Sequence, residues 1–372
     1  MVTAGGLRHT RGRAYPAPAV CFPGASGKMG GMLSRYRATG ADLPFGDPLR
    51  AHGVAMEGYF WRLSDPASGR VIVALCGVHR GRAGKTWANV ALASHPGGTV
   101  AAADVDSAFA DPQALGVRAG DGVLDADARG VRVDLGPDAR LDLRLDDVRP
   151  WSRRSLGGLG IGQVAPVLSQ HWHPYVLGAR ASGTAQVGGE AVDLAGFRVY
   201  AEKNWGREGF PEQWWWGQAQ CFPEGDTCVA FAGGTVAVAG LTTTASAVAV
   251  RLGDRLIRLG DPVLSRARVV ARDGSWSLRA RGPRYSVEIE ATAGPSDAHV
   301  LPVPLPASGY SVAGALQHFA GELRLVVRRR GRVQFSGTSP LAGLERGGVE
   351  QLKTEIARRR ATDQVTAEGA AT

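Results

Sequence analysis

The chain has 372 residues, of which 44% are hydrophobic and 21% are charged, and its formal net charge is +9. This composition is typical of a folded globular protein and excludes a disordered or collagen-like chain. A single hydrophobic core stops growing at roughly 250 to 300 residues, so a chain of this length predicts two domains.

Residues 1–50 are rich in Gly, Pro and Ala and have weak periodicity, which predicts an irregular lead-in. The next segment, 51–160, contains short alternating or continuous apolar runs separated by turn residues, for example at 58–63. Such runs predict β-strands, and residues 131–145 spell a hairpin around Gly136-Pro137-Asp138. We therefore expect a first β-barrel-like domain over 51–160.

The stretch from Trp151 to Gln163 is rich in Gly and Ser and has no periodicity, so we place the domain boundary there. A second β-barrel-like domain is expected over 164–342, with closely spaced strands throughout. Residues 343–372 are expected to form a C-terminal helix, at about 347–360, followed by a disordered polar tail. Three hairpin turns are predicted in this half, at Gly188-Gly189, Gly253-Asp254 and Arg330-Gly331.

The fold class follows from this texture of many short strands without helices of 10 to 15 residues between them. We predict an all-β protein made of two consecutive lipocalin-like antiparallel β-barrel or sandwich domains. Barrels of about eight strands commonly enclose a small ligand, so the architecture also predicts a pocket.

Cationic residues are spread along the chain, with tight basic runs only at 328–332 and 358–360. A nucleic-acid surface needs Lys and Arg clustered on one face, so no nucleic acid partner is expected. No apolar run approaches the ~20 residues of a membrane-spanning helix, and the first twenty residues lack the apolar core of a secretory signal. We expect a cytoplasmic protein; peripheral contact with a membrane is left open.

The four cysteines, Cys21, Cys76, Cys221 and Cys228, lack the paired CxxC spacing of zinc and iron–sulfur sites, so no metal site is predicted. Cys221 and Cys228 flank a turn and could face each other across a hairpin. In a reducing compartment two buried thiols are the expected state, although the sequence leaves their pairing open.

The densest group of aromatic and polar residues runs from His171 to Gln220. In an extended strand, the period of two places Tyr200, Glu202 and Asn204 on one face and Lys203 and Trp205 on the other. The same rule groups His171 with His173 and Tyr175, and Trp214 with Trp216, Gln218 and Gln220. A carboxylate, imidazoles and indoles are thereby predicted to converge on one cavity.

These motifs resemble the core block of the tocopherol cyclase family. The resemblance rests on His171-Trp172, Tyr200-Ala-Glu-Lys-Asn-Trp-Gly206, Gly209-Phe210-Pro211, Trp214-Trp215-Trp216 with Gln218, and Ala230-Phe-Ala-Gly-Gly234. Glu57-Gly58-Tyr59-Phe60 and Phe319-Ala-Gly-Glu-Leu-Arg-Leu325 are also similar to motifs of that family. The likeness is strong over about 170–240 and thin elsewhere.

The resemblance implies two lipocalin-like barrels and closure of a prenylated hydroquinone to a chromanol, or action on a related terpenoid. Such an intramolecular lyase or isomerase needs a proton donor for an alkene, π faces for a cation and an acceptor for the phenol proton. It needs no metal, nucleotide or redox cofactor. The expected partner is an apolar prenyl-type small molecule, and the oligomeric state is unknown.

Glu202 is the candidate acid, because desolvation among indoles keeps a carboxyl protonated. His171 is the candidate for receiving or orienting the phenol, and Glu57 is the second-choice acid. The expected substrate-binding residues are Tyr200, Asn204, Trp205, Trp172, Trp214, Trp216, Gln218 and Tyr59.

Two other functions are compatible with the same pattern. A non-catalytic lipocalin-like carrier of a prenyl quinone, carotenoid or other apolar lipid would use the same aromatic pocket for binding alone. A structural or interaction module would have barrels filled by side chains and Glu202 in solvent.

Overall fold

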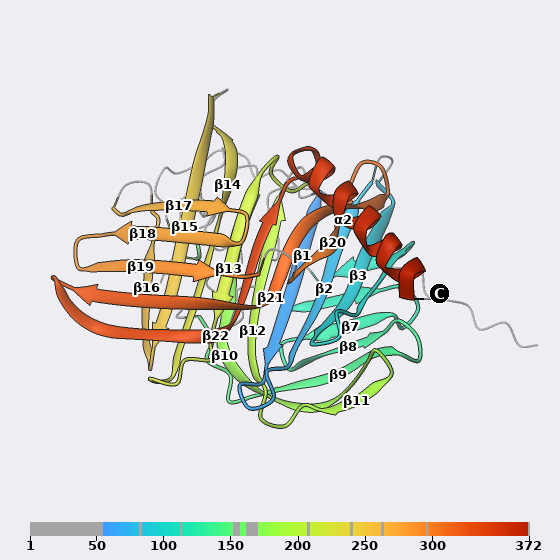
Figure 1. Ribbon diagram of the computed structural model, residues 1–372, viewed down its shortest axis with the longest axis horizontal. Helices are drawn as coiled ribbons and strands as arrows, with labels where there is room; N and C mark the ends of the chain where they lie inside the picture. Colours follow the sequence, from blue (N-terminus) through green and yellow to red (C-terminus); the bar gives the residue numbers. More distant parts are fainter. Residues whose placement is uncertain are drawn as a thin grey trace, which may run out of the picture.

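The structure is a computed structural model, and it confirms the all-β fold class. It describes residues 55–81, 84–111, 114–151, 157–160, 170–206, 209–238, 241–261, 264–294 and 297–370. The irregular lead-in expected over 1–50 lies outside the described residues. Figure 1 shows the strands arranged in two groups side by side, with the first half of the chain, in blue and green, packed against the yellow and orange second half.

The first sheet is antiparallel and contains twelve strands of the described residues, in the order β4-β3-β2-β1-β12-β10-β9-β8-β7-β6-β5, with β11 paired to β10. Its strands are β1 (Met56–Ser64), β2 (Val71–Arg80), β3 (Thr86–His95), β4 (Val100–Val105), β5 (Ala108–Ala110), β6 (Gly116–Ala119), β7 (Leu124–Asp127), β8 (Gly130–Asp134), β9 (Ala139–Asp146), β10 (Gln170–Val187), β11 (Glu190–Asp193) and β12 (Arg198–Gly206).

The second sheet is also antiparallel, with ten strands of the described residues in the order β16-β15-β14-β13-β22-β21-β19-β18-β17 and β20 paired to β21. Its strands are β13 (Trp214–Ala219), β14 (Thr227–Val238), β15 (Leu241–Leu252), β16 (Arg255–Leu259), β17 (Arg266–Arg272), β18 (Ser275–Arg281), β19 (Tyr285–Thr292), β20 (Ala298–Leu305), β21 (Tyr310–Arg329) and β22 (Arg332–Gly347).

Each sheet curls until its two ends lie close together. The terminal strands of the first sheet, β4 and β5, are consecutive in the chain, and so are β16 and β17 at the ends of the second. A short connection between two edge strands requires those edges to be near each other. This rolling brings the two edges of each sheet near each other and gives each half a barrel-like interior.

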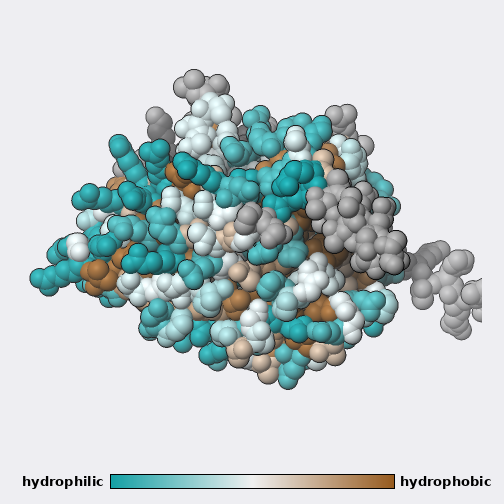
Figure 2. Space-filling model, in the orientation of Figure 1, coloured by the Kyte–Doolittle hydropathy of each residue, from teal (hydrophilic) through white to brown (hydrophobic). Residues whose placement is uncertain are grey.

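Strict alternation builds both interiors. In β9, with the sequence ARLDLRLD, the Ala and Leu residues are buried and the Arg and Asp residues are exposed. In β17 and β18 exposed arginines alternate with apolar residues in the same way. The face seen in Figure 2 is accordingly largely hydrophilic over the β16–β19 end of the molecule.

The three predicted hairpin turns are confirmed. Gly188-Gly189 joins β10 to β11, Gly253-Asp254 joins β15 to β16, and Arg330-Gly331 joins β21 to β22. Gly188 and Gly189 have φ values of 59° and 82°, and Arg330 and Gly331 have 50° and 83°, the left-handed values that two-residue hairpins with type I′ turns require.

The change of sheet falls after β12, whereas the sequence pattern places the domain boundary at residues 151–163. Strands β10, β11 and β12 follow that segment in the chain but pair within the first sheet, where β12 lies between β1 and β10. Local composition marks a loop, but it does not say which strands will pair across it.

Long strands are a second difference. The sequence pattern predicts two strands, near 171–178 and 180–187, but residues 170–187 form one strand with register shifts between His173 and Ala179. Strand β20 was not expected from the sequence, and its two prolines interrupt the usual strand signal.

The C-terminal helix, α2 (Val349–Ala370), extends through the segment expected to be a disordered tail. It begins after β22, which carries the second sheet as far as Gly347. Leu352 and Ile356 pack on Leu316 of β21; the helix is the red coil labelled α2 in Figure 1. In the described part of the chain, no helix has the length and apolar character needed to cross a membrane.

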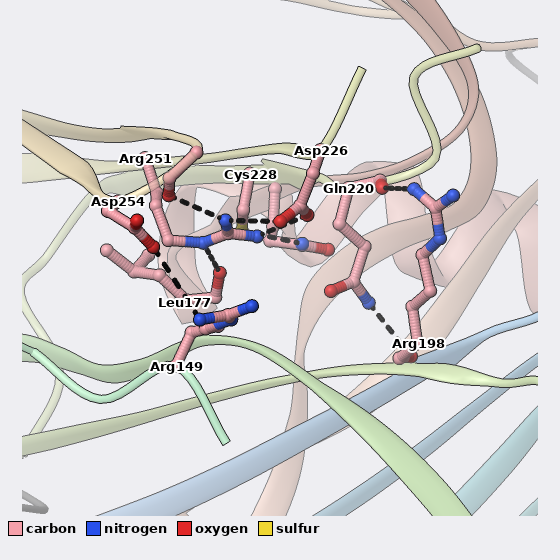
Figure 3. Close-up of polar contacts among 10 residues, drawn as sticks. Arg149, Leu177, Arg198, Gln220, Asp226, Cys228, Arg251 and Asp254 are labelled. Atoms are coloured by element: carbon pink, nitrogen blue, oxygen red, sulfur yellow. Dashed lines mark hydrogen bonds and ion pairs between the residues drawn. The ribbon is translucent and has the colours of Figure 1, made fainter. Parts of the chain in front are cut away.

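Arginines fasten the two sheets together. Arg251 of β15 donates from Nε to the carbonyl of Leu177 on β10 at 2.6 Å, and its guanidinium binds both carboxylate oxygens of Asp226 (Figure 3). Arg62 of β1 is fully buried and donates to the carbonyls of Phe319 and Leu341 in the second sheet. These hydrogen bonds from buried guanidinium groups to carbonyls of the opposite sheet favour one packing of the two halves.

Nearby, Cys221 and Cys228 are free buried thiols, the state expected from the sequence for a reducing compartment.

Candidate active site between the two sheets

A large cavity, of about 1170 Å³, lies where the two sheets face each other. Its walls come from β1, β2, β3, β10 and β12 of the first sheet and from β13, β14, β15, β17, β18, β19, β20, β21 and β22 of the second. A cavity of this size fits a molecule larger than most drug-sized ligands. The predicted pocket is therefore present, and it is shared by the two halves, reaching from the first sheet to β17, β18 and β19 of the second.

Glu202 of β12 lies in the wall of this cavity and is 5% exposed. Its Oε2 accepts three hydrogen bonds, from Trp172 Nε1 at 2.7 Å, the Tyr200 hydroxyl at 2.5 Å and Trp216 Nε1 at 2.8 Å. No hydrogen bond within the described residues reaches Oε1. The side chain is buried, which excludes the surface position required of a structural module.

Two opposing effects act on the Glu202 carboxyl. Burial raises its pKa, because the charged form loses its water shell, while the hydrogen bonds from Tyr200, Trp172 and Trp216 lower it. The net shift of the pKa is upward. The result is a carboxyl whose protonated form is favoured by desolvation and whose conjugate base already has three donors.

The indoles of Trp214 and Trp216 lie on one face of β13, as the period of two predicts, and both line the cavity. Glycines of the neighbouring strand β22 make room for them. A Cβ on Gly347 would stand inside the Trp214 ring, and one on Gly343 would come within 2.9 Å of the Trp216 ring. Gly347 and Gly343 therefore leave the space that the indoles of Trp214 and Trp216 occupy, and Glu345 lies between these two glycines.

Glu345 is a second cavity carboxyl that the sequence interpretation missed. It accepts hydrogen bonds from Trp214 Nε1 at 2.6 Å and from Gln317 Nε2 at 3.0 Å. Burial raises its pKa from the usual 4.5 to about 7, the charge of Glu202 adds to the rise, and the Trp214 bond opposes it. The sequence alone offers only a weak signal for Glu345, namely Gly343 and Gly347 four positions apart on either side of it.

His171 lines the cavity and stacks on Trp205 with ring centroids 5.3 Å apart. His173, two residues along β10, is buried away from it and accepts a hydrogen bond from the backbone of Gly158. Burial, with a contribution from the nearby charge of Lys203, lowers the pKa of His173 to about 3. His173 is therefore a neutral structural residue, and the ring of His171, which stacks on its cross-strand partner Trp205, lies on the face of the sheet opposite Glu202.

Glu57, the second-choice acid, is engaged elsewhere. Its Oε2 lies 3.0 Å from Nζ of Lys203, which is fully buried and also bonds the hydroxyl of Tyr59 at 2.8 Å. Lys203 points away from Glu202, as the alternation of β12 predicts. Glu57 is not among the described residues that line the cavity, and its carboxylate forms an ion pair with a buried cation.

The other predicted binding residues divide into two groups. Asn204, Trp172 and Tyr59 line the cavity with Trp214 and Trp216, and Tyr200 reaches it through Glu202. Trp205 and Gln218 are not among the described residues in the cavity wall. Trp205 lies on the Lys203 face of β12, and Gln218 contacts Cys228. Both are corrected to core positions, because alternation turns Trp205 away from Glu202 and burial closes around Gln218.

Among the residues that the structure describes, no three His, Cys, Asp or Glu side chains are grouped so that they could hold a metal ion.

Comparison with known proteins now adds to this geometry. A family model described as tocopherol cyclase-like matches residues 121–348, well over half of the chain. The chloroplastic tocopherol cyclase of Zea mays is 25% identical over 240 residues, which are 61% of this chain. The chain spans about half the length of that maize relative.

Solved structures share the fold at low sequence identity. A structure of CghA with Sch210972 superposes with a TM-score of 0.55 at 12% identity, covering 83% of this chain and 92% of the other. A second structure of CghA gives 0.52 at 12% identity, with 82% and 91% covered. Kievitone hydratase from Nectria haematococca gives 0.49 at 12% identity, with 82% and 91% covered. At such identities the likeness speaks for the lipocalin-like fold alone.

Proposed function

The chain belongs to the tocopherol cyclase-like family, and from that premise we propose that it is an enzyme which closes a prenylated hydroquinone, or a related prenylated terpenoid, to a chromanol-type ring. The observation that carries the proposal is the state of Glu202. It is a buried carboxyl in the wall of a large cavity, and donors from both sheets converge on one of its oxygens.

Protonation of the alkene is the first step. Oε2 already accepts three hydrogen bonds, so the acidic proton of Glu202 resides on Oε1. The O–H bond breaks, the alkene π pair forms a C–H bond with that proton, and a tertiary carbocation results. The three donors stabilise the carboxylate left behind, which is the charge that develops in this step.

Ring closure is the second step. The phenol oxygen attacks the cationic carbon, a C–O bond forms, and the phenol O–H bond breaks. We propose that the Glu202 carboxylate takes that proton, which regenerates the acid, so the product is an isomer of the substrate. His171, expected from the sequence to receive the phenol proton, is not proposed as this base, because its ring stacks on Trp205 on the opposite face of the sheet.

Aromatic faces stabilise the cation between the two steps. The rings of Trp172, Trp216 and Phe60 all line the cavity, and Phe60 meets Trp216 edge-on with centroids 5.2 Å apart. A cation within about 6 Å of such a ring is attracted by its electron-rich face. An apolar prenyl chain also fits walls made largely of aromatic and aliphatic side chains.

The experiment uses geranylgeranyl- or phytyl-hydroquinone in detergent and D₂O, with products followed by chromatography and mass detection. The wild type is expected to yield a chromanol carrying one carbon-bound deuterium, because Glu202 exchanges its proton with solvent. Glu202→Gln is expected to bind the substrate and lose turnover by at least about 100-fold. Glu322→Gln, the same change at an exposed strand position, is the matched control.

The carrier function makes a different prediction in the same experiment. A carrier of a prenyl quinone or carotenoid would return the hydroquinone unchanged and bound in a stoichiometric amount, and its affinity would not depend on Glu202. That result in the wild type would reject the cyclase proposal in favour of transport.

A further inference from the structure

Four residues in register form a row across the first sheet. Asn89 of β3 is the partner of Gly77 on β2, Gly77 is the partner of Gly58 on β1, and Gly58 is the partner of Asn204 on β12. All four line the cavity. Two glycines side by side in the interior of a sheet weaken it, and such positions often mark a close approach to the backbone.

Polar side chains from the flanking strands occupy the space above these glycines. A Cβ on Gly58 would come within 2.4 Å of Asn204 Oδ1. One on Gly77 would come within 2.3 Å of Asn89 Oδ1 and 2.5 Å of His79 Nε2. The glycines therefore let two amides and an imidazole lie flat against the sheet, where they form a polar floor to an otherwise largely apolar cavity.

This floor, made of Asn89, His79 and Asn204, offers hydrogen-bond acceptors. His79 Nε2 and Asn89 Oδ1 are 2.6 Å apart, and since an amide oxygen only accepts, Nε2 carries the proton and Nδ1 is left as an acceptor. Burial lowers the pKa of His79 to about 4, so the ring is neutral. Within the described residues, neither His79 Nδ1 nor Asn204 Oδ1 has a hydrogen-bond partner.

The floor ends beside the acid. Asn204 lies two residues after Glu202 on the same face of β12, and its cross-strand partner is Trp172, whose indole donates to Glu202. In an ortho-prenylated phenol the alkene carbon that accepts the proton is two bonds from the aromatic ring. Ring and alkene must therefore bind side by side, as the floor and Glu202 do.

We propose that the hydroxylated aromatic ring of the substrate binds to Asn204, Asn89 and His79. These side chains lie above Gly58 and Gly77. This inference rests on the proposed function and names the part of the cavity that holds the ring. The floor selects a ligand with O–H donors, because its free acceptors bind a phenol and gain nothing from a ring whose oxygens carry no hydrogen. The prenyl chain then extends along the apolar walls.

The test measures binding without turnover. The probe is a hydroquinone with a saturated ortho-alkyl chain, kept reduced, and it is compared with its dimethyl ether, which has the same ring and chain but no O–H group. Dissociation constants are measured by quenching of tryptophan fluorescence. The wild type is expected to bind the phenol at least about tenfold more tightly than the ether, as loss of one or two buried hydrogen bonds implies.

Asn204→Leu and Gly58→Ala are expected to weaken phenol binding about tenfold and to leave ether binding unchanged. Gly225→Ala is the matched control, because its Cβ would meet nothing within 4 Å. If Gly58→Ala does not fold, Asn204→Leu carries the test alone. Equal affinity of the wild type for both ligands, or equal losses for both in Asn204→Leu, would overturn the proposal.

This outcome is separable from that of the cyclase assay. An Asn204-dependent preference for the phenol, together with no chromanol formed in D₂O, would retain the ring site and reject the reaction. Chromanol formation without any preference for the phenol would retain the reaction and reject the ring site.

Discussion

The indole N–H of Trp216, on the second sheet, donates to Oε2 of Glu202, on the first, at 2.8 Å. The proposed acid is therefore held by both halves of the molecule. Trp172 supplies a comparable bond from the same sheet as Glu202. The strength of the acid depends on the packing of the sheets, which Arg251 and Arg62 fix by bonds to backbone carbonyls across the contact.

Removing one of these donors should weaken the acid without removing it. We expect Trp216→Phe to keep the ring face and the fold but to lower turnover by about tenfold or more, because hydrogen bonds to charged groups contribute about 1.5–3 kcal/mol. The pKa of the acid should rise at the same time. Turnover at saturating substrate, measured across pH, checks both effects.

Trp61→Phe is the control for this change. Trp61 is fully buried in the first interior, and within the described residues its indole N–H has no hydrogen-bond partner, so no donor is lost there. Equal turnover in Trp216→Phe and Trp61→Phe would mean that the bond to Glu202 does not stabilise the carboxylate in the reaction.

The grouping of Tyr200, Glu202 and Asn204 was predictable because alternation in an extended strand depends only on sequence spacing. The bond from Tyr200 to Glu202 and the place of Asn204 in the cavity wall follow from it. The same spacing turns Trp205 away, so assigning Trp205 to the binding wall went beyond the pattern. Which residues of one strand share a face can thus be predicted from the local sequence alone.

Residues on other strands could not be found in this way. Glu345 and Asn89 reach the cavity because β22 pairs with β13 and β3 pairs with β2. Such strand pairing cannot be predicted from the composition of a short segment. Glu345 also lies in a segment whose charges resemble a polar C-terminal tail. The change of sheet after β12 could not be read from composition for the same reason, since β12 pairs with β1, which is far from it in the sequence.

Glu57 should prove to be structural. It compensates the charge of Lys203, which is fully buried, and removing one member of a buried ion pair typically costs about 3–5 kcal/mol. We expect Glu57→Gln to lower the free energy of unfolding by about this amount and to leave turnover per folded molecule within a few-fold of the wild type. Urea unfolding and active-site-normalised kinetics measure the two quantities.

The double variant Glu57→Gln with Lys203→Met tests the cause of that loss. Removing the cation as well should restore part of the stability, because no uncompensated charge is left in the interior. A Glu57→Gln protein that is fully stable but inactive would instead identify Glu57 as a reacting group.

Glu345 should make stability depend on pH near neutrality. Its folded-state pKa of about 7 lies above the ordinary 4.5, so the folded state binds the proton more tightly. Its contribution to stability is fully present below about pH 4.5, declines as the pH rises toward 7, and is lost above that. A rise from 4.5 to about 7 corresponds to a loss on the order of 3 kcal/mol.

The variant Glu345→Gln isolates this contribution from other titrations. The difference in unfolding free energy between wild type and variant should change across pH 4.5 to 7 and be constant on either side. A difference that is flat over that range would place the Glu345 pKa near its ordinary value and remove Glu345 from the set of protonated cavity groups.

The aromatic wall should affect the rate more than binding. Phe60 lines the cavity edge-on to Trp216, so its ring can interact with the carbocation, which exists only after protonation. We expect Phe60→Leu, which keeps an apolar side chain of similar size, to lower kcat by about 3- to 30-fold, with KM changed by less than about twofold.

Phe222→Leu is the matched control, because Phe222 is buried in the second interior and is not among the described cavity residues. A variant at Phe60 that raises KM and spares kcat would show that the ring only holds the prenyl chain, and the stabilisation of the cation would then have to come from the indoles of Trp172 and Trp216.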